Sequence, residues 1–127
     1  MGQELNTLSG EVIGAAIEVH RLLGSGLLES AYELALEREL VIRGLGVERQ
    51  KAVLLEYKGT ALGDGFRIDL LVEGQLIVEV KAVESIMPIH EVQLLTYLRL
   101  TDTRLGLLIN FNERAIKDGV KRVVNRL

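Results

Sequence analysis

The chain of 127 residues contains no cysteine and no tryptophan, has one proline, and is only 4% aromatic. Without cysteine, neither disulfide bonds nor thiolate metal sites contribute to the structure or the chemistry. With so few aromatic residues, the core has to be built from aliphatic side chains. The lack of cysteine also suits a reducing compartment, and we expect a cytoplasmic protein.

The sequence also lacks any apolar stretch of membrane-spanning length. Residues 1–8 do not contain the basic segment and apolar run of a secretion signal. Hydrophobic residues make up 48% of the chain and charged residues 26%, which is typical of soluble globular proteins. This length fits one core and leaves no room for a second. We expect a single domain over residues 1–127 with no membrane partner.

Basic charge is scarce overall, because the net charge is −3, and this disfavours indiscriminate binding of a polyanion. The C-terminal segment is an exception. Its basic residues are Arg114, Lys117, Lys121, Arg122 and Arg126, against the single acid Asp118. Such a segment is either a phosphate-contacting strip or a solvated amphipathic end, and the pattern does not decide between them.

Apolar periodicity predicts three helices, over residues 8–23, 27–43 and 88–101. Asn6 or Thr7 would cap the first helix, and Pro88 would open the third. Strands are predicted over 47–57 and 104–110, followed by a short helix and a final strand near 121–124. This order predicts an α/β sandwich with a mixed sheet of four to five strands flanked by helices.

The most informative stretch is residues 66–82, where apolar residues alternate with polar ones at the period of a strand. We interpret it as an antiparallel hairpin with a loop at 73–75, in which all even-numbered apolar residues from Phe66 to Val80 face one core. The register then opposes Leu70 to Val78 and Ile68 to Val80.

In this register Asp69 lies opposite Glu79 on the face that the apolar residues leave free. Lys81 shares that face because it follows Glu79 by two residues, and Arg67 lies across from Lys81. Two carboxylates roughly 5 Å apart repel each other, and a hard cation such as Mg²⁺ or Mn²⁺ relieves the repulsion. The main-chain carbonyl of Val80 is a further candidate ligand.

A lysine beside such a cation can steady the attacking water or the developing negative charge, which is machinery for phosphodiester hydrolysis. The alternative is an ordinary exposed strand face on which Asp69, Glu79 and Lys81 form weak surface ion pairs.

On the third predicted helix, His90, Gln93 and Tyr97 have the spacing of one polar stripe. Gln93 could orient the attacking water or a carboxylate, and Tyr97 and His90 could contact a phosphate. For His90 a hydrogen bond at the start of the helix is the stronger alternative. For Tyr32, packing competes with substrate contact.

The sequence resembles the GxxExxY proteins, a branch of the PD-(D/E)XK nuclease-like superfamily. The resemblance covers the residues of segments 14–20, 26–32, 69, 79–81, 90–97 and 106–111. It implies a restriction-endonuclease-like fold and a metal-dependent nuclease, with Asp69 and Glu79 as metal ligands and Lys81 as the catalytic lysine. Gln93 and Tyr97 match a QxxxY signature of related nucleases.

The motif Gly26-x-x-Glu29-x-x-Tyr32 gives the family its name, and the resemblance implies that Glu29 is a third carboxylate at the metal. A glutamate in the first turn of a helix is also favoured by the helix dipole alone. We therefore expect a Mg²⁺-dependent or Mn²⁺-dependent nuclease that cuts DNA, with Tyr97, Tyr32, His90 and Arg67 contacting substrate. It would act as a homodimer or beside a protein partner. The alternative is a non-catalytic nucleic-acid-binding or protein-interaction module that keeps the fold.

Overall fold

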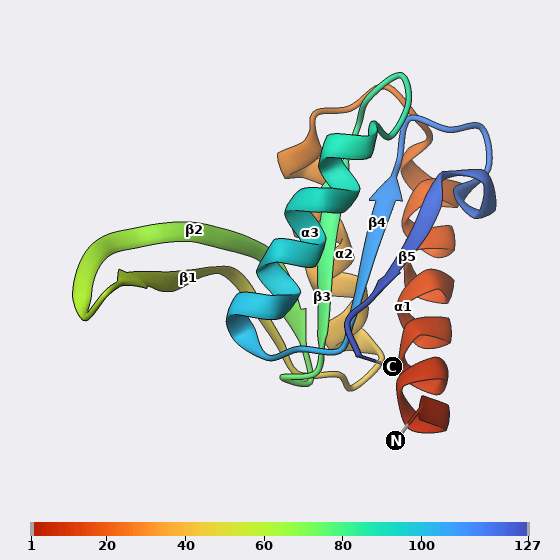
Figure 1. The fold of residues 1–127 in the computed structure, drawn as a ribbon. Helices are drawn as coiled ribbons and strands as arrows, with labels where there is room; N and C mark the ends of the chain where they lie inside the picture. The colour runs from red at the N-terminus through yellow and green to blue at the C-terminus, as the bar shows by residue number, and fades with distance from the viewer. Residues whose placement is uncertain (1, 127) are drawn as a thin grey trace.

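The computed structural model describes residues 2–126 and contains one five-stranded mixed sheet with helices on both faces (Figure 1). This confirms the predicted α/β fold class. The elements are α1 (Gly2–Leu23), α2 (Glu29–Ile42), β1 (Val47–Tyr57), β2 (Thr60–Val72), β3 (Leu76–Lys81), α3 (Pro88–Thr101), β4 (Leu105–Asn110), the 3₁₀ helix η1 (Ile116–Gly119) and β5 (Val120–Val124).

The strands lie side by side in the order of the sequence, β1-β2-β3-β4-β5. Only β3 and β4 run parallel, and the chain between them forms α3, as a parallel connection requires. The other neighbouring strands are antiparallel. No helix within residues 2–126 is long and apolar enough to cross a membrane.

Helix α1 is longer than the sequence predicted, because it begins at Gly2 and not near residue 8. The prediction that Asn6 or Thr7 caps the helix is therefore wrong, since both lie inside it. Glu4 suits the first turn of a helix, where the dipole favours an acid. Leu5 is buried, so the first turns pack on the core and extend the helix.

The core consists of two apolar clusters, one on each face of the sheet. Helices α1 and α2 cover Leu76, Val78 and Val80 of β3 on one face. On the other face, Leu94 and Leu98 of α3 cover Ile77. Glu79 and Lys81 have the parity of Ile77 and lie on the α3 face.

Strand β2 does not keep all its even-numbered residues on one face, which corrects the sequence prediction. Leu70 and Val72 pack with α1 and α2, whereas Ile68 and Phe66 pack in the cluster below α3. The strand therefore turns over between residues 68 and 70. Strict alternation assumes an uninterrupted ladder, and the ladder between β2 and β3 ends at Leu70, where the change of face occurs.

The distal halves of β1 and β2 form a two-stranded arm that projects from the sheet (Figure 1). Lys58 and Gly59 both have positive φ, as a two-residue hairpin turn requires. The register shifts twice, beside Val53 and beyond Leu54. Leu54 is 69% exposed, so the arm lacks the helical cover of the rest of the sheet.

We expect Gly106→Ala to destabilise the protein by about 1–3 kcal/mol, because the added methyl would lie 2.8 Å from Leu94 Cδ1 and push α3 away from β4. Gly10→Ala is the matched control, since a methyl there meets no atom within 4 Å. Gly10 lies inside α1, so alanine should stabilise the protein by about 0.5–1 kcal/mol. Urea denaturation measures both changes. Equal effects of the two substitutions would contradict the close packing of α3 on Gly106.

Candidate metal centre

Asp69 and Glu79 lie where the hydrogen-bond ladder between β2 and β3 stops. The ladder pairs only Leu70 with Val78, Leu71 with Ile77 and Val72 with Leu76. Beyond it, the main-chain N–H of Asp69 donates to Glu79 Oε2 at 2.9 Å, and that of Val80 donates to Asp69 Oδ2 at 2.9 Å.

The predicted pairing of Ile68 with Val80 is therefore not part of the ladder, because side-chain carboxylates accept the hydrogen bonds that main-chain carbonyls would otherwise accept. Each acid bridges to the other's strand. The two side chains are neighbours, as the hairpin register predicted.

Burial, and after it the negative charge of Asp69, raise the pKa of Glu79 to about 8. The N–H of Asp69 and the charge of Lys81 act in the opposite direction. Burial also raises the pKa of Asp69, and the charge of Glu33 adds to this effect. The protein surroundings therefore compensate the charge of two carboxylates only in part, and in the cation-free protein the pair keeps a proton to higher pH.

Lys81 is half-buried at the end of β3, and its charge lowers the pKa of both acids. Its ammonium group is thus close enough to interact with both carboxylates. Carboxylate, carboxylate and lysine come from two adjacent strands, and their mutual distances are set by the sheet and not by a loop.

A third acid reaches the pair from α2, on the opposite face of the sheet. Glu33 is only 6% exposed. The amide of Gln50 links it to the pair, because Nε2 lies 2.7 Å from Glu33 Oε1 and 3.2 Å from Asp69 Oδ1. Arg49 Nη1 also lies 3.4 Å from Glu33 Oε1.

Neither Glu33 nor Gln50 was among the predicted site residues. For Glu33 a signal was present, since an acid shares the helical stripe of Leu36 and Leu40, which are both buried. An acid within an apolar stripe needs a buried polar partner. For Gln50 we find no such signal, because it stands between Arg49 and Lys51 in a polar stretch of the strand.

Glu29, the predicted third carboxylate, is exposed at the start of α2. Its Oε2 accepts a hydrogen bond of 3.2 Å from the N–H of Ala82, just beyond the end of β3. Glu29 therefore lies next to the C-terminal end of β3, one helical turn from Glu33.

Tyr97 borders the acids from α3. Burial raises the pKa of its hydroxyl, and the charges of Glu79 and Asp69 raise it further. Its ring stacks on Phe66 of β2, with the centroids 4.3 Å apart. Gln93 lies one turn earlier on α3 and is exposed.

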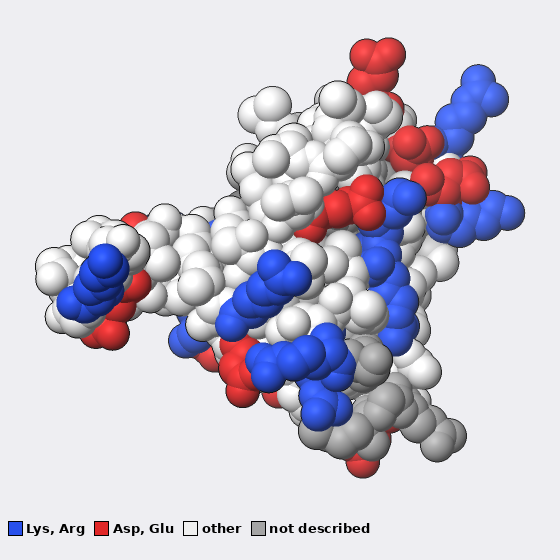
Figure 2. Space-filling model, viewed as in Figure 1, with Lys and Arg blue, Asp and Glu red and all other residues white. Residues whose placement is uncertain are grey.

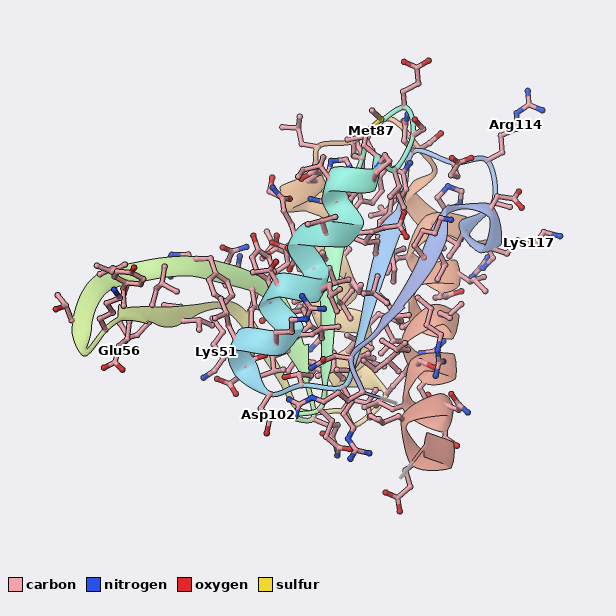
Figure 3. The ribbon with its side chains drawn as sticks, viewed as in Figure 1. Lys51, Glu56, Met87, Asp102, Arg114 and Lys117 are labelled. Carbon is pink, nitrogen blue, oxygen red and sulfur yellow. The ribbon has the colours of Figure 1, made fainter. Side chains whose placement is uncertain are left out.

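His90 accepts a hydrogen bond on Nδ1 from the N–H of Met87, at 2.9 Å. This bond caps the first turn of α3, which is the helix-start hydrogen bond that we gave as the alternative for His90. Figure 3 labels Met87 at this end of the helix. Arg67 is exposed, and its Nη1 donates to the carbonyl of Gln50 at 3.2 Å. Arg67 also forms an ion pair with Asp64.

Tyr32 is fully buried and its ring stacks on Phe111. Its hydroxyl donates to the carbonyl of Gly24 at 2.6 Å and accepts from the N–H of Leu27 at 3.1 Å. Both its ring and its hydroxyl are used inside the protein, which favours packing over substrate contact.

Oxygen donors are the ligands that Mg²⁺ and Mn²⁺ prefer, so the chemistry of Asp69, Glu79 and Glu33 fits such a cation. Within residues 2–126, however, no three His, Asp or Glu side chains form a ready metal cage. Main-chain N–H groups instead donate to Oδ2 of Asp69 and Oε2 of Glu79.

A well-formed cavity lies elsewhere in the described part of the chain. It measures about 430 Å³ and is lined by residues before β3 and after α3, among them Gln75, Asp102 and Arg104. None of the predicted site residues lines it. The acids instead lie beside α3, at the base of the arm.

A family model described as the PD-(D/E)XK nuclease superfamily matches residues 6–123. The chain therefore belongs to this superfamily. Searches of curated proteins and of solved structures gave no match.

The raised pKa of Glu79 predicts a dependence of stability on pH in the cation-free protein. The unfolded carboxyl titrates near 4.5 and the folded one near 8, so the folded state holds the proton between these values. The free energy of unfolding should therefore fall as the pH rises from 4.5 to 8. Glu79→Gln removes this contribution.

Urea denaturation at pH 5, 6.5 and 8, with EDTA present, measures the effect. The free energy of unfolding of wild type should fall relative to that of Glu79→Gln as the pH rises. A difference that stays constant over this range would show that Glu79 is not buried beside a second negative charge.

Proposed function

We propose that this protein is a divalent-metal-dependent nuclease that hydrolyses phosphodiester bonds of DNA. The single observation that carries the proposal is the reciprocal bridge between Asp69 and Glu79 on adjacent strands, with Lys81 near both carboxylates. Superfamily membership supports it, because this class of fold is named for its nucleases. Structural ion-pair networks also perturb pKa values, so the pKa shifts alone would not suffice.

In this proposal, Asp69, Glu79 and the main-chain carbonyl of Val80 hold Mg²⁺ or Mn²⁺. When bound, such a cation lowers the pKa of water and neutralises charge on the phosphate. Glu33 is the third buried acid, and Glu29 supports the site from the exit of β3, where it accepts from Ala82.

Lys81 stabilises the negative charge that develops on the phosphate, because its positive charge acts at the two acids. Gln93 and Tyr97, on the side of α3 that borders the acids, orient the attacking water and a phosphate oxygen. His90 and Arg67 contact substrate at the edge of the site. Because His90 Nδ1 already accepts from Met87 N–H, His90 can contact only a substrate group that lies at the start of α3.

The partner would be DNA, recognised through its backbone, ends or shape and not through its base sequence. Lys and Arg side chains gather over β5 and the adjoining surface in Figure 2. Lys121 and Arg122 of β5 are exposed. A segment of this charge is suited to phosphate contacts that depend on salt. In this proposal the protein acts as a homodimer or with a protein partner.

Lys81→Ala should reduce cleavage by roughly 100-fold or more, because it removes a charge that stabilises the transition state. The measurement is degradation of linear, circular, single-stranded and branched DNA at varied Mn²⁺. Lys51→Ala is the matched control, since Lys51 is a lysine of the arm that pairs with Glu48 (Figure 3). Equal degradation by wild type and Lys81→Ala would expose a contaminant and remove Lys81 from the mechanism.

A calorimetric Mn²⁺ titration of wild type and Asp69→Ala separates the nuclease from a non-catalytic module. We expect binding that depends on Asp69, since its carboxylate lies in the buried pair. If wild type and variant bind Mn²⁺ equally, or neither binds, the module interpretation is favoured.

A further inference from the structure

Gln50 has a backbone conformation that its position in the sheet does not explain. Its φ is 52°, in the left-handed region that residues other than glycine rarely adopt. It stands inside β1, between the pairs Arg49 with Leu70 and Lys51 with Ile68. Strained residues of this kind persist only where the surroundings hold them, and they cluster at functional sites.

Three hydrogen bonds hold Gln50 in place. Its main-chain carbonyl accepts from Arg67 Nη1 at 3.2 Å. Its side-chain Nε2 donates to Glu33 at 2.7 Å and to Asp69 at 3.2 Å. Both hydrogens of one amide are thus directed at two acids from different elements, one on α2 and one on β2.

The amide nitrogen of Gln50 therefore occupies a position between two carboxylate oxygens, where a cation would otherwise compensate the charge. An amide differs from a lysine or arginine here because it is neutral and has two functional ends. Rotation about its last side-chain bond exchanges the NH₂ donor for the carbonyl acceptor. Amide oxygens are ordinary ligands of hard divalent cations.

We infer that Gln50 is an additional metal ligand of this site. It bridges Glu33 and Asp69 through its NH₂ in the cation-free protein, and it presents its Oε1 when a divalent cation binds between them. The inference rests on the proposed function, from which it takes the cation. Gln50 thus stabilises the site in the cation-free protein and contributes to the affinity for the cation.

Gln50→Met tests this inference without changing charge, because methionine has a similar volume and no amide. The empty site should lose stability, since Glu33 and Asp69 lose a donor. Affinity for Mn²⁺ should fall roughly 10- to 100-fold, as for other residues that support metal ligands. Gln75→Met is the matched control, since Gln75 is exposed in the loop before β3.

Two measurements on the intact protein give the result, Mn²⁺ titration calorimetry and thermal unfolding with EDTA or Mn²⁺. If Gln50 only competed with the cation, Gln50→Met would bind Mn²⁺ more tightly than wild type, and this would overturn the inference. Affinity equal to wild type would overturn it as well. Gln50→Glu provides a second variant, because a carboxylate keeps the acceptor and loses the donor.

For Gln50→Glu we expect a lower melting temperature with EDTA, because a third carboxylate faces Glu33 and Asp69. We also expect a larger rise in melting temperature on adding Mn²⁺ than in wild type, since tighter binding stabilises the folded state more. No larger rise than in wild type would contradict a ligand role for this position.

The outcomes distinguish this inference from the proposed function. Failure of wild type to bind Mn²⁺ defeats the proposed function and the inference together. Binding by wild type that Asp69→Ala abolishes and Gln50→Met leaves unchanged defeats the inference alone.

Discussion

The structure depends on the exchange of hydrogen-bond acceptors between β2 and β3. Past Leu70 and Val78 the main-chain ladder ends, and the carboxylates of Asp69 and Glu79 accept from main-chain N–H groups across the gap. These side-chain hydrogen bonds connect β2 and β3 beyond the last pair of the main-chain ladder. It also fixes two acids on rigid elements, which positions them more accurately than a loop would.

The same arrangement explains why the protein offsets the negative charge of the acids only in part. Main-chain N–H groups are dipoles, and a dipole offsets a buried negative charge less completely than a cation does. The charge of Glu33 raises the pKa of Asp69 further, and the hydrogen bond from Gln50 lowers it. The fold satisfies the hydrogen bonds of these acids but not their charge, and the proposed cation site rests on this difference.

Much of the fold could be predicted because its signals are local. The bounds of α3 follow from Pro88 and the apolar period, and those of β3 from alternation. The neighbouring positions of Asp69 and Glu79 follow from the register of one hairpin. The change of face at Ile68 could not be predicted, since it coincides with the end of the ladder to β3 and with packing against α3.

The part played by Glu33 and Gln50 also lies beyond a reading of local pattern. Glu33 reaches the pair from a helix on the other face of the sheet, and its contact with Gln50 spans 17 residues. Gln50 acts through a left-handed φ, which the flanking polar residues do not signal. Both depend on how three separate elements meet, and the sequence describes each element alone.

The arm joins the sheet at the same residues that hold the acids. Gln50 and Arg67 lie at its base, one on each strand, and a hydrogen bond connects them. A change in the angle of the arm against the sheet would therefore move the amide that bridges Glu33 and Asp69. If the acids bind a cation as proposed, the cation and a molecule bound to the arm would change each other's affinity by the same factor.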